Sequence, residues 1–213
     1  MREDIVKNWA NKNDIHITQL QLEKLAKFQA HVIETNNTMN LTAITDSDGF
    51  AVKHIIDSLT LLPYIPTGAS VIDVGTGAGF PGVVLGIMRP DINLSLLDSL
   101  KKRIRFLEAS LVMLGLDEVK CIPERAEDWA RTSGNVYDIC TARAVAKMDK
   151  LLKYTLPLVN TNGMLLAMKG PDVNEEVDMA EKVLKKLGGI VKSVDKIEIE
   201  DGVWRSVVVV GRL

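Results

Sequence analysis

The sequence is poor in the residues that mark secreted, membrane-spanning and metal-binding proteins. Only two cysteines occur among its 213 residues, Cys121 and Cys140, and they lie far apart in the chain. Disulfide scaffolds and cysteine zinc sites need several cysteines at short spacing, so both are excluded, and we expect buried reduced thiols and no metal. No apolar run approaches the roughly 20 residues of a membrane span, and the polar start at residues 1–4 is unlike a signal peptide. We therefore expect a cytoplasmic protein.

An excess of basic charge is also missing. The net charge is −2 and the isoelectric point is near 6.0, which does not indicate a protein that binds nucleic acid over its whole surface. The densest basic segment, residues 101–105, opens a predicted helix, where positive charge opposes the helix dipole. It indicates either an anion nearby or simply a solvated helix face.

A glycine-rich turn follows a predicted buried strand at residues 70–74. Glycines remove the Cβ where the backbone turns sharply or approaches a ligand, and the helix predicted from residue 81 to 88 begins with unpaired amide donors. A second strand at residues 93–97 ends at Asp98, roughly 20 residues beyond the glycines, where a ribose needs an acceptor. This order predicts a Rossmann-like site for a nucleotide-type cofactor.

The glycines can be read in two registers. Residues 77–82 match the dinucleotide fingerprint G-x-G-x-x-G, which by itself is weak evidence. Asp73, Gly75, Gly77 and Gly79 instead resemble motif I of S-adenosylmethionine-dependent methyltransferases, in which the carboxylate end of the strand faces the cationic amino acid part of the cofactor. We favour the methyltransferase, with a nicotinamide-dependent oxidoreductase as the alternative.

The order of the other elements predicts the fold class. Residues 1–66 are predicted to form a helical cap, with one helix that begins at Thr18 and ends in the polar stretch 35–40, and a second at residues 52–62. Residues 67–213 form the second domain. Further helices are expected at residues 101–114, 147–156 and 173–187, further strands at 119–122, 137–141 and 164–168, and a connecting turn at 132–135. This alternation predicts a parallel sheet with helices on both faces.

The last two predicted strands, residues 190–198 and 204–210, break the alternation. The link between them is too short for a parallel crossover, so they form an antiparallel hairpin. An α/β chain with a mostly parallel sheet that ends in such a hairpin is typical of the class I S-adenosylmethionine-dependent methyltransferase fold, whereas dinucleotide folds are usually parallel throughout.

Several segments together resemble one family. They are DVGTGAGFPG at 73–82, LDSLKKR at 97–103, RAE at 125–127, TARA at 141–144, NLT at 40–42, HIIDSL at 54–59 and LAMKG at 166–170. In this order and spacing the chain resembles the RsmG family of small-subunit ribosomal RNA methyltransferases, formerly called glucose-inhibited division protein B. Some members carry a basic proline-rich tail that this sequence lacks, so we expect its RNA affinity to come from the body of the protein.

The resemblance implies transfer of a methyl group from S-adenosylmethionine to N7 of one guanine in 16S ribosomal RNA, naked or in the small subunit, by a monomer. Guanine N7 has an in-plane lone pair and no proton, so the reaction needs no general base and depends on positioning and electrostatics. Residues 141–144 also lack the Pro-Pro-aromatic loop of enzymes that methylate exocyclic amines. A small-molecule methyltransferase and a non-enzymatic binder remain alternatives.

Site residues follow from the same segments. No catalytic residue is assigned, although Arg143 is a candidate for orienting the guanine. Phe80 is alternatively a core residue, Asp98 a helix N-cap and Glu127 a solvated acid, and the roles of Asn40, His54 and Asp57 are open. The expected cofactor-binding residues are Gly75, Gly77, Phe80, Asp98, Ala126, Glu127 and Arg143, and the expected phosphate surface is Lys101, Lys102, Arg103, Arg105 and Lys169.

Overall fold

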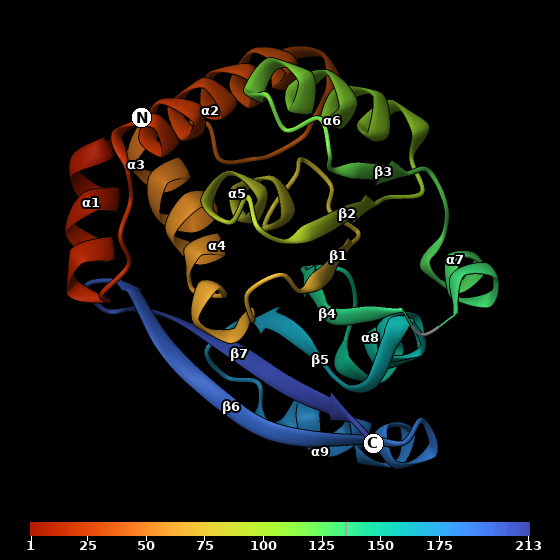
Figure 1. The fold of residues 1–213 in the computed structure, drawn as a ribbon. Coiled ribbons are helices and arrows are strands. Elements are labelled where there is room, and N and C mark those ends of the chain that lie inside the picture. Colours follow the sequence, from red (N-terminus) through yellow and green to blue (C-terminus); the bar gives the residue numbers. More distant parts are fainter. Residues whose placement is uncertain (135) are drawn as a thin grey trace.

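A mixed sheet forms the centre of the protein (Figure 1). The computed structural model describes residues 1–134 and 136–213, and within them the sheet has seven strands in the order β3-β2-β1-β4-β5-β7-β6. The parallel strands are β1 (Ser70–Val74), β2 (Asn93–Leu97), β3 (Lys120–Ile122), β4 (Tyr137–Arg143) and β5 (Val159–Lys169). β6 (Gly189–Glu200) and β7 (Val203–Arg212) form an antiparallel hairpin, with β7 paired to β5. The predicted fold class is confirmed.

Helices cover both faces of the sheet (Figure 1). Successive strand residues point to opposite faces, so Val71 packs into one apolar core and Ile72 into the other. One face carries α1 (Glu3–Lys12), α2 (Gln19–Met39), α3 (Ser47–Phe50), η1 (Ala51–Ile56), α4 (Asp57–Leu59), α5 (Gly82–Met88) and α6 (Lys101–Leu114). The other carries α7 (Ala126–Ser133), α8 (Met148–Thr155) and α9 (Asn174–Lys186), and the short 3₁₀ turns η2 (Leu62–Tyr64) and η3 (Leu156–Leu158) complete the chain.

The N-terminal helices share their core with the sheet. Thr18 begins α2 as predicted, through a capping box in which its side chain accepts from Gln21 N and the Gln21 side chain accepts from Thr18 N. α2 runs through most of the expected polar stop and ends only at Asn40, whose φ is 49°. Phe28 of α2 packs against Phe80 after β1, with ring centres 5.3 Å apart. A domain boundary at residue 66 therefore stays a prediction, because the apolar core crosses it.

The single helix predicted at residues 52–62 is wrong in its bounds. A helical segment begins at Ser47, passes through the π-helix η1 and ends at Leu59. The hydroxyl of Thr60 donates to Asp57 O at 2.6 Å, and such a local bond competes with continuation of the helix. The π turn brings Lys53 and His54, and the following residue Asp57, to the carboxyl end of β4.

The helix α7 was not predicted. Ala126, Trp129 and Ala130 recur at helical spacing and pack against the core of this face, but the segment has only eight residues and the apolar pattern covers a single turn. Its first turn carries Glu127 and Asp128, which favour a helix N-terminus. Residues 132 and 133 of the expected connecting turn belong to α7, and residue 135 of that turn lies outside the described residues.

The substitution Gly82→Ala tests how tightly the turn after β1 is closed. A Cβ at position 82 would lie 2.8 Å from Asp73 Oδ2 and collide with the Leu96 side chain. We expect the free energy of unfolding in urea to fall by about 1–3 kcal/mol, the usual cost of overpacking. Gly170→Ala is the matched control because its Cβ would meet nothing within 4 Å. Equal losses for the two variants would contradict this account.

Candidate cofactor and substrate site

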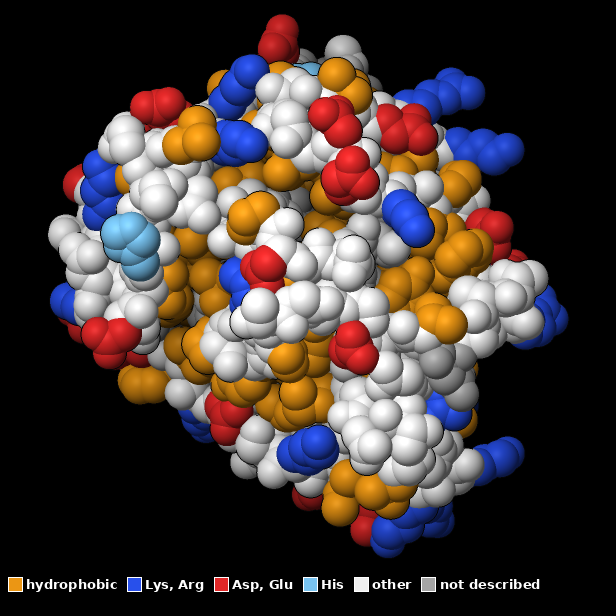
Figure 2. All heavy atoms as spheres, viewed as in Figure 1, with side chains coloured by type: hydrophobic (Ala, Val, Ile, Leu, Met, Phe, Trp, Pro, Cys, Tyr) orange, Lys and Arg blue, Asp and Glu red, His pale blue; other side chains and the backbone are white. Residues whose placement is uncertain are grey.

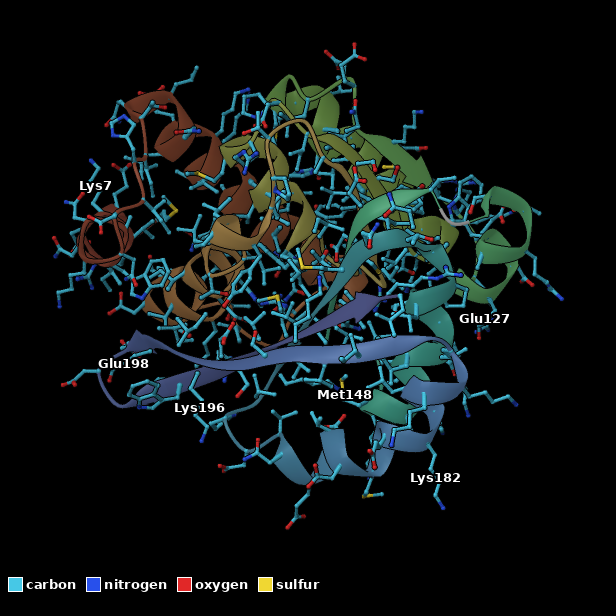
Figure 3. The ribbon with its side chains drawn as sticks, turned by 60° about the horizontal axis from the view of Figure 1, so that its bottom comes forward. Lys7, Glu127, Met148, Lys182, Lys196 and Glu198 are labelled. Carbon is cyan, nitrogen blue, oxygen red and sulfur yellow. The ribbon has the colours of Figure 1, made fainter. Side chains whose placement is uncertain are left out.

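A cavity of about 440 Å³ opens at the carboxyl ends of the parallel strands. Ligands of α/β sheets bind at this edge, where the strand order reverses between β1 and β4. Four predicted cofactor residues, Gly75, Asp98, Ala126 and Glu127, line this cofactor cavity. Glu127 lies on α7, on the opposite side of the molecule from Lys7 of α1 (Figure 3). The structure thus gathers residues from three separate sequence segments around one space.

Asp98 is held rigidly in the cavity wall. Its side chain is 4% exposed. Oδ1 accepts from Leu100 N at 2.8 Å, and Oδ2 accepts from Gly77 N at 3.1 Å and from Arg103 Nη1 at 3.2 Å. A carboxylate has about four acceptor positions, so a ligand hydroxyl finds at most one of them open while Arg103 is bound. Leu100, and not Asp98, is the N-cap residue of α6.

Space at Gly75 and backbone conformation at both Gly75 and Gly77 exclude side chains from the glycine turn. Gly75 has φ of +68°, and a Cβ on it would lie 2.8 Å from Val145 Cγ2. Gly77 has φ of +60° and contributes its N–H to Asp98. Phe80 is only 3% exposed and its ring lies in the core beneath the turn, as in the alternative interpretation. Contact of Gly77 and Phe80 with a cofactor stays a prediction.

The predicted phosphate surface is divided in the structure. Lys101, Lys102 and Arg105 are exposed at the start of α6, whereas Arg103 turns into the cofactor cavity and pairs with Asp98. Lys169 is 12% exposed and donates to Glu176 Oε1 at 2.6 Å and to Ala146 O at 2.7 Å. Figure 2 shows basic and acidic side chains interspersed over one face of the molecule. RNA binding by this set stays a prediction, with three of its members free to meet a phosphate at the surface.

A second cavity of about 380 Å³ adjoins the first. We call it the arginine cavity; Arg143, Arg205, His54 and Asp57 line it, together with apolar side chains that include Met168. Ala144, whose φ is +54°, lines both cavities. The two spaces therefore meet at the residue that directly follows β4.

Arg143 is the centre of the arginine cavity. Its Nη1 donates to Lys53 O at 2.8 Å and to Asp57 Oδ2 at 3.0 Å, and its Nη2 lies 3.2 Å from His54 Nδ1. The guanidinium also lies 5.3 Å from the centre of the Phe80 ring. Arg205 Nε lies 3.4 Å from Asp57 Oδ1. The predicted cofactor-contacting arginine thus lies outside the cofactor cavity, and its role toward the cofactor stays a prediction.

Burial controls the charges of the groups around Arg143. Burial, reinforced by the positive charge of Arg143, lowers the pKa of His54 to about 3, so this imidazole is neutral at physiological pH. Burial raises the pKa of Asp57, and the guanidinium groups of Arg143 and Arg205 oppose that shift. The network therefore carries its positive charge on the two arginines.

Comparisons with known proteins agree with this architecture. Residues 21–204 match the family model described as GidB, rRNA small subunit methyltransferase G. The chain belongs to the GidB family. It is 41% identical to ribosomal RNA small subunit methyltransferase G of Desulforamulus reducens, covering 98% of this chain and 89% of that protein. The protein of the same name from Alkaliphilus oremlandii is 42% identical over 93% of this chain and 84% of its own length.

Solved structures support the fold independently. The chain superposes on cofactor-bound Rv0187 from MTB with a TM-score of 0.61 at 14% identity, covering 88% of each chain. It superposes on M. jannaschii TYW2 in complex with AdoMet with a TM-score of 0.60 at 17% identity, covering 80% of each chain. At this identity the likeness shows the fold alone, and it confirms the class I methyltransferase architecture of this GidB family member.

Several site residues carried no assignable role in the sequence. Ala144 stands inside the TARA segment, but its left-handed backbone conformation is visible only in the structure. Arg205 lies in the final hairpin, and no local pattern connects it to Asp57.

Asp73 does not face the cofactor cavity as motif I suggests, because its side chain is fully buried. Tyr154 and Val145 join the cofactor cavity from the segment after β4.

The remaining expectations concern thiols, metals and membranes. Burial raises the pKa of Cys121 to about 11, and it also raises the pKa of Cys140 well above its usual value. Neither thiol is therefore a thiolate nucleophile at neutral pH. The described residues contain no cluster of three or more His, Cys, Asp or Glu side chains suited to a metal ion. Among the same residues, no helix combines the length and apolar character needed to cross a membrane.

The low pKa of His54 predicts a pH dependence of stability. The unfolded chain takes up a proton near pH 6.5 while the native imidazole stays neutral to about pH 3, so stability falls as the pH drops through this window. Between pH 7.5 and pH 5 the loss attributable to His54 is about 2 kcal/mol, since each pKa unit is worth about 1.4 kcal/mol. Urea unfolding at both pH values should show this loss in the native sequence and not in His54→Asn. Parallel losses in the two proteins would contradict it.

Proposed function

We propose that this protein transfers the methyl group of S-adenosylmethionine to N7 of a guanine in 16S ribosomal RNA. The observation that carries the proposal is the meeting of two cavities at Ala144, the first lined by three acids and two arginines and the second by Arg143 and Arg205. Its GidB relatives are named for methylation of small-subunit ribosomal RNA. The cofactor cavity holds the methyl donor, and the arginine cavity receives the base.

The cofactor cavity fits S-adenosylmethionine. This donor supplies an electrophilic methyl group on a positively charged sulfur. The acids Asp98, Glu124 and Glu127 outnumber the two arginines of the cavity wall and suit the cationic groups of this ligand. Gly75, Asp98, Ala126 and Glu127 would hold it, with Arg103 moving from Asp98 to admit a ribose hydroxyl.

A nicotinamide cofactor fits less well. The fingerprint at residues 77–82 would have to offer free amides to a pyrophosphate at the start of α5. The amide of Gly82 instead donates to the buried Asp73 Oδ2 at 2.9 Å. The side chain of Asp73 is fully buried, so this donor is not available to a ligand. The structure therefore favours the methyltransferase interpretation.

The arginine cavity suits a base that needs no deprotonation. Guanine N7 is already a nucleophile, so the protein has to orient the base and exclude water from it. Arginine commonly donates to O6 and N7 at the guanine edge. Donation from Arg143 to O6 alone orients the ring and leaves the N7 lone pair free to attack.

The test is methyl transfer from tritiated S-adenosylmethionine to small ribosomal subunits that lack the modification, with naked 16S RNA in parallel. We expect label in the RNA that is recovered at sites of N7-specific strand scission. The variant Asp98→Ala tests the donor site. It should bind the donor at least tenfold more weakly in equilibrium dialysis, because the best-placed acceptor for a ribose is gone. Absence of label from both forms of RNA, or label that resists N7-specific scission, would sink the proposal.

The exposed lysines of α6 give a separate prediction about RNA. Replacing Lys101 and Lys102 together by Gln should weaken binding to 16S RNA on the order of tenfold at low salt and reduce the salt slope by roughly 1.5, because two phosphate contacts are lost. Affinity for S-adenosylmethionine should not change. The matched control replaces Lys182 and Lys186 of α9, which lies on the far side of the molecule from α6 (Figures 1 and 3). Equal weakening by both pairs would contradict a localised surface.

A further inference from the structure

His54 is held more tightly than a histidine that merely fills space. Its Nδ1 lies 3.2 Å from Arg143 Nη2 and its Nε2 lies 2.8 Å from Thr42 Oγ1. Its ring stacks on Phe80 with centres 4.5 Å apart and planes 9° apart, and the edge of Phe50 packs against it at 4.9 Å. Hydrogen bonds fix the ring within its plane and the aromatic rings fix the plane itself.

These contacts select one tautomer. A guanidinium can only donate, so Nδ1 must be the acceptor toward Arg143 and carries no proton. The proton therefore sits on Nε2 and points to Thr42 Oγ1, which also accepts from Ile44 N at 3.0 Å. The neutral imidazole is a fixed acceptor presented to the guanidinium.

Arg143 is gripped along one side by a single helical turn. Lys53 O, His54 Nδ1 and Asp57 Oδ2 all come from η1 and the residue that follows it. These contacts use three of the five N–H groups of the guanidinium. The Nε–H and one Nη2–H have no partner among the described residues, and the Arg143 side chain lines the arginine cavity.

We propose that His54 is a positioning residue for the target guanine: by accepting from Arg143 Nη2, it directs the remaining N–H groups of Arg143 toward O6 of the base and away from N7. This assignment rests on the proposed function. Asp57 supplies the charge that holds Arg143, and His54 sets the rotation of the guanidinium. Without the His54 acceptor, the guanidinium can turn and donate to N7 itself, which would occupy the lone pair that attacks the methyl group.

A double-mutant cycle separates this role from a structural one. His54→Phe keeps a ring to stack on Phe80 but removes the acceptor, whereas His54→Asn supplies an amide oxygen in its place. We measure single-turnover transfer of tritiated methyl to small subunits lacking the modification, at saturating donor and saturating subunits, with and without Arg143→Gln. The dissociation constant for S-adenosylmethionine and the urea midpoint are measured for every variant.

The expected pattern is specific to the transfer step. His54→Phe should slow transfer about 100-fold, the scale of a small misplacement at a reacting centre, with donor affinity unchanged within about twofold. His54→Asn should recover at least tenfold of that loss. In the Arg143→Gln background, His54→Phe should add less than about twofold, because its effect passes through Arg143.

Other outcomes overturn the assignment in distinguishable ways. Suppose that the native protein labels RNA. If His54→Phe transfers the methyl group equally fast, or if it slows transfer by the same factor with and without Arg143→Gln, His54 does not act through Arg143. If the native protein labels no RNA, the proposed function fails first. Should His54→Phe not fold, Thr42→Val serves instead, since it removes the hydrogen-bond partner that holds Nε2 and so fixes the ring within its plane. It should slow transfer about tenfold only when Arg143 is present, and an equal slowing in both backgrounds would overturn the assignment.

Discussion

The buried carboxylate of Asp73 holds together the part of the fold on which both cavities depend. Its two oxygens accept from Gly82 N and Thr141 Oγ1, each at 2.9 Å, and so tie β1 to the start of α5 and to β4. Burial raises its pKa, and donors from the turn and from Thr141 oppose that shift. Because the turn is closed from beneath, the Gly77 amide is left to meet Asp98 at the cavity wall.

The two adjacent cavities differ in the balance of their charged groups. In the cofactor cavity three acids outnumber two arginines, which suits a cationic sulfonium compound, whereas in the arginine cavity Arg143 and Arg205 suit the acceptor edge of a purine. The near-neutral net charge of the chain hides this difference. Composition therefore says little about a partner when the relevant charges are few and enclosed.

The segments HIIDSL and TARA lie far apart in the sequence and form one structure. The π turn, through Lys53 and His54, and the following residue Asp57 contact Arg143 at the end of β4. Phe80 supports both His54 and Arg143 from the core. π turns often occur at functional sites because they change the register of a helix locally. The N-terminal helices thus build one wall of the site as well as part of the core.

Local chemistry alone determined much of this protein. The strand, glycine turn and acid around residues 70–98, the bounds of α6 and the antiparallel hairpin follow from short-range pattern and link length, and the structure agrees. Long-range contacts decided the rest. The direction of Arg143 depends on a helix some 90 positions earlier, and the place of Arg205 depends on Asp57. A local sequence pattern does not predict these side-chain partners, because they depend on which helices and strands the sheet brings together.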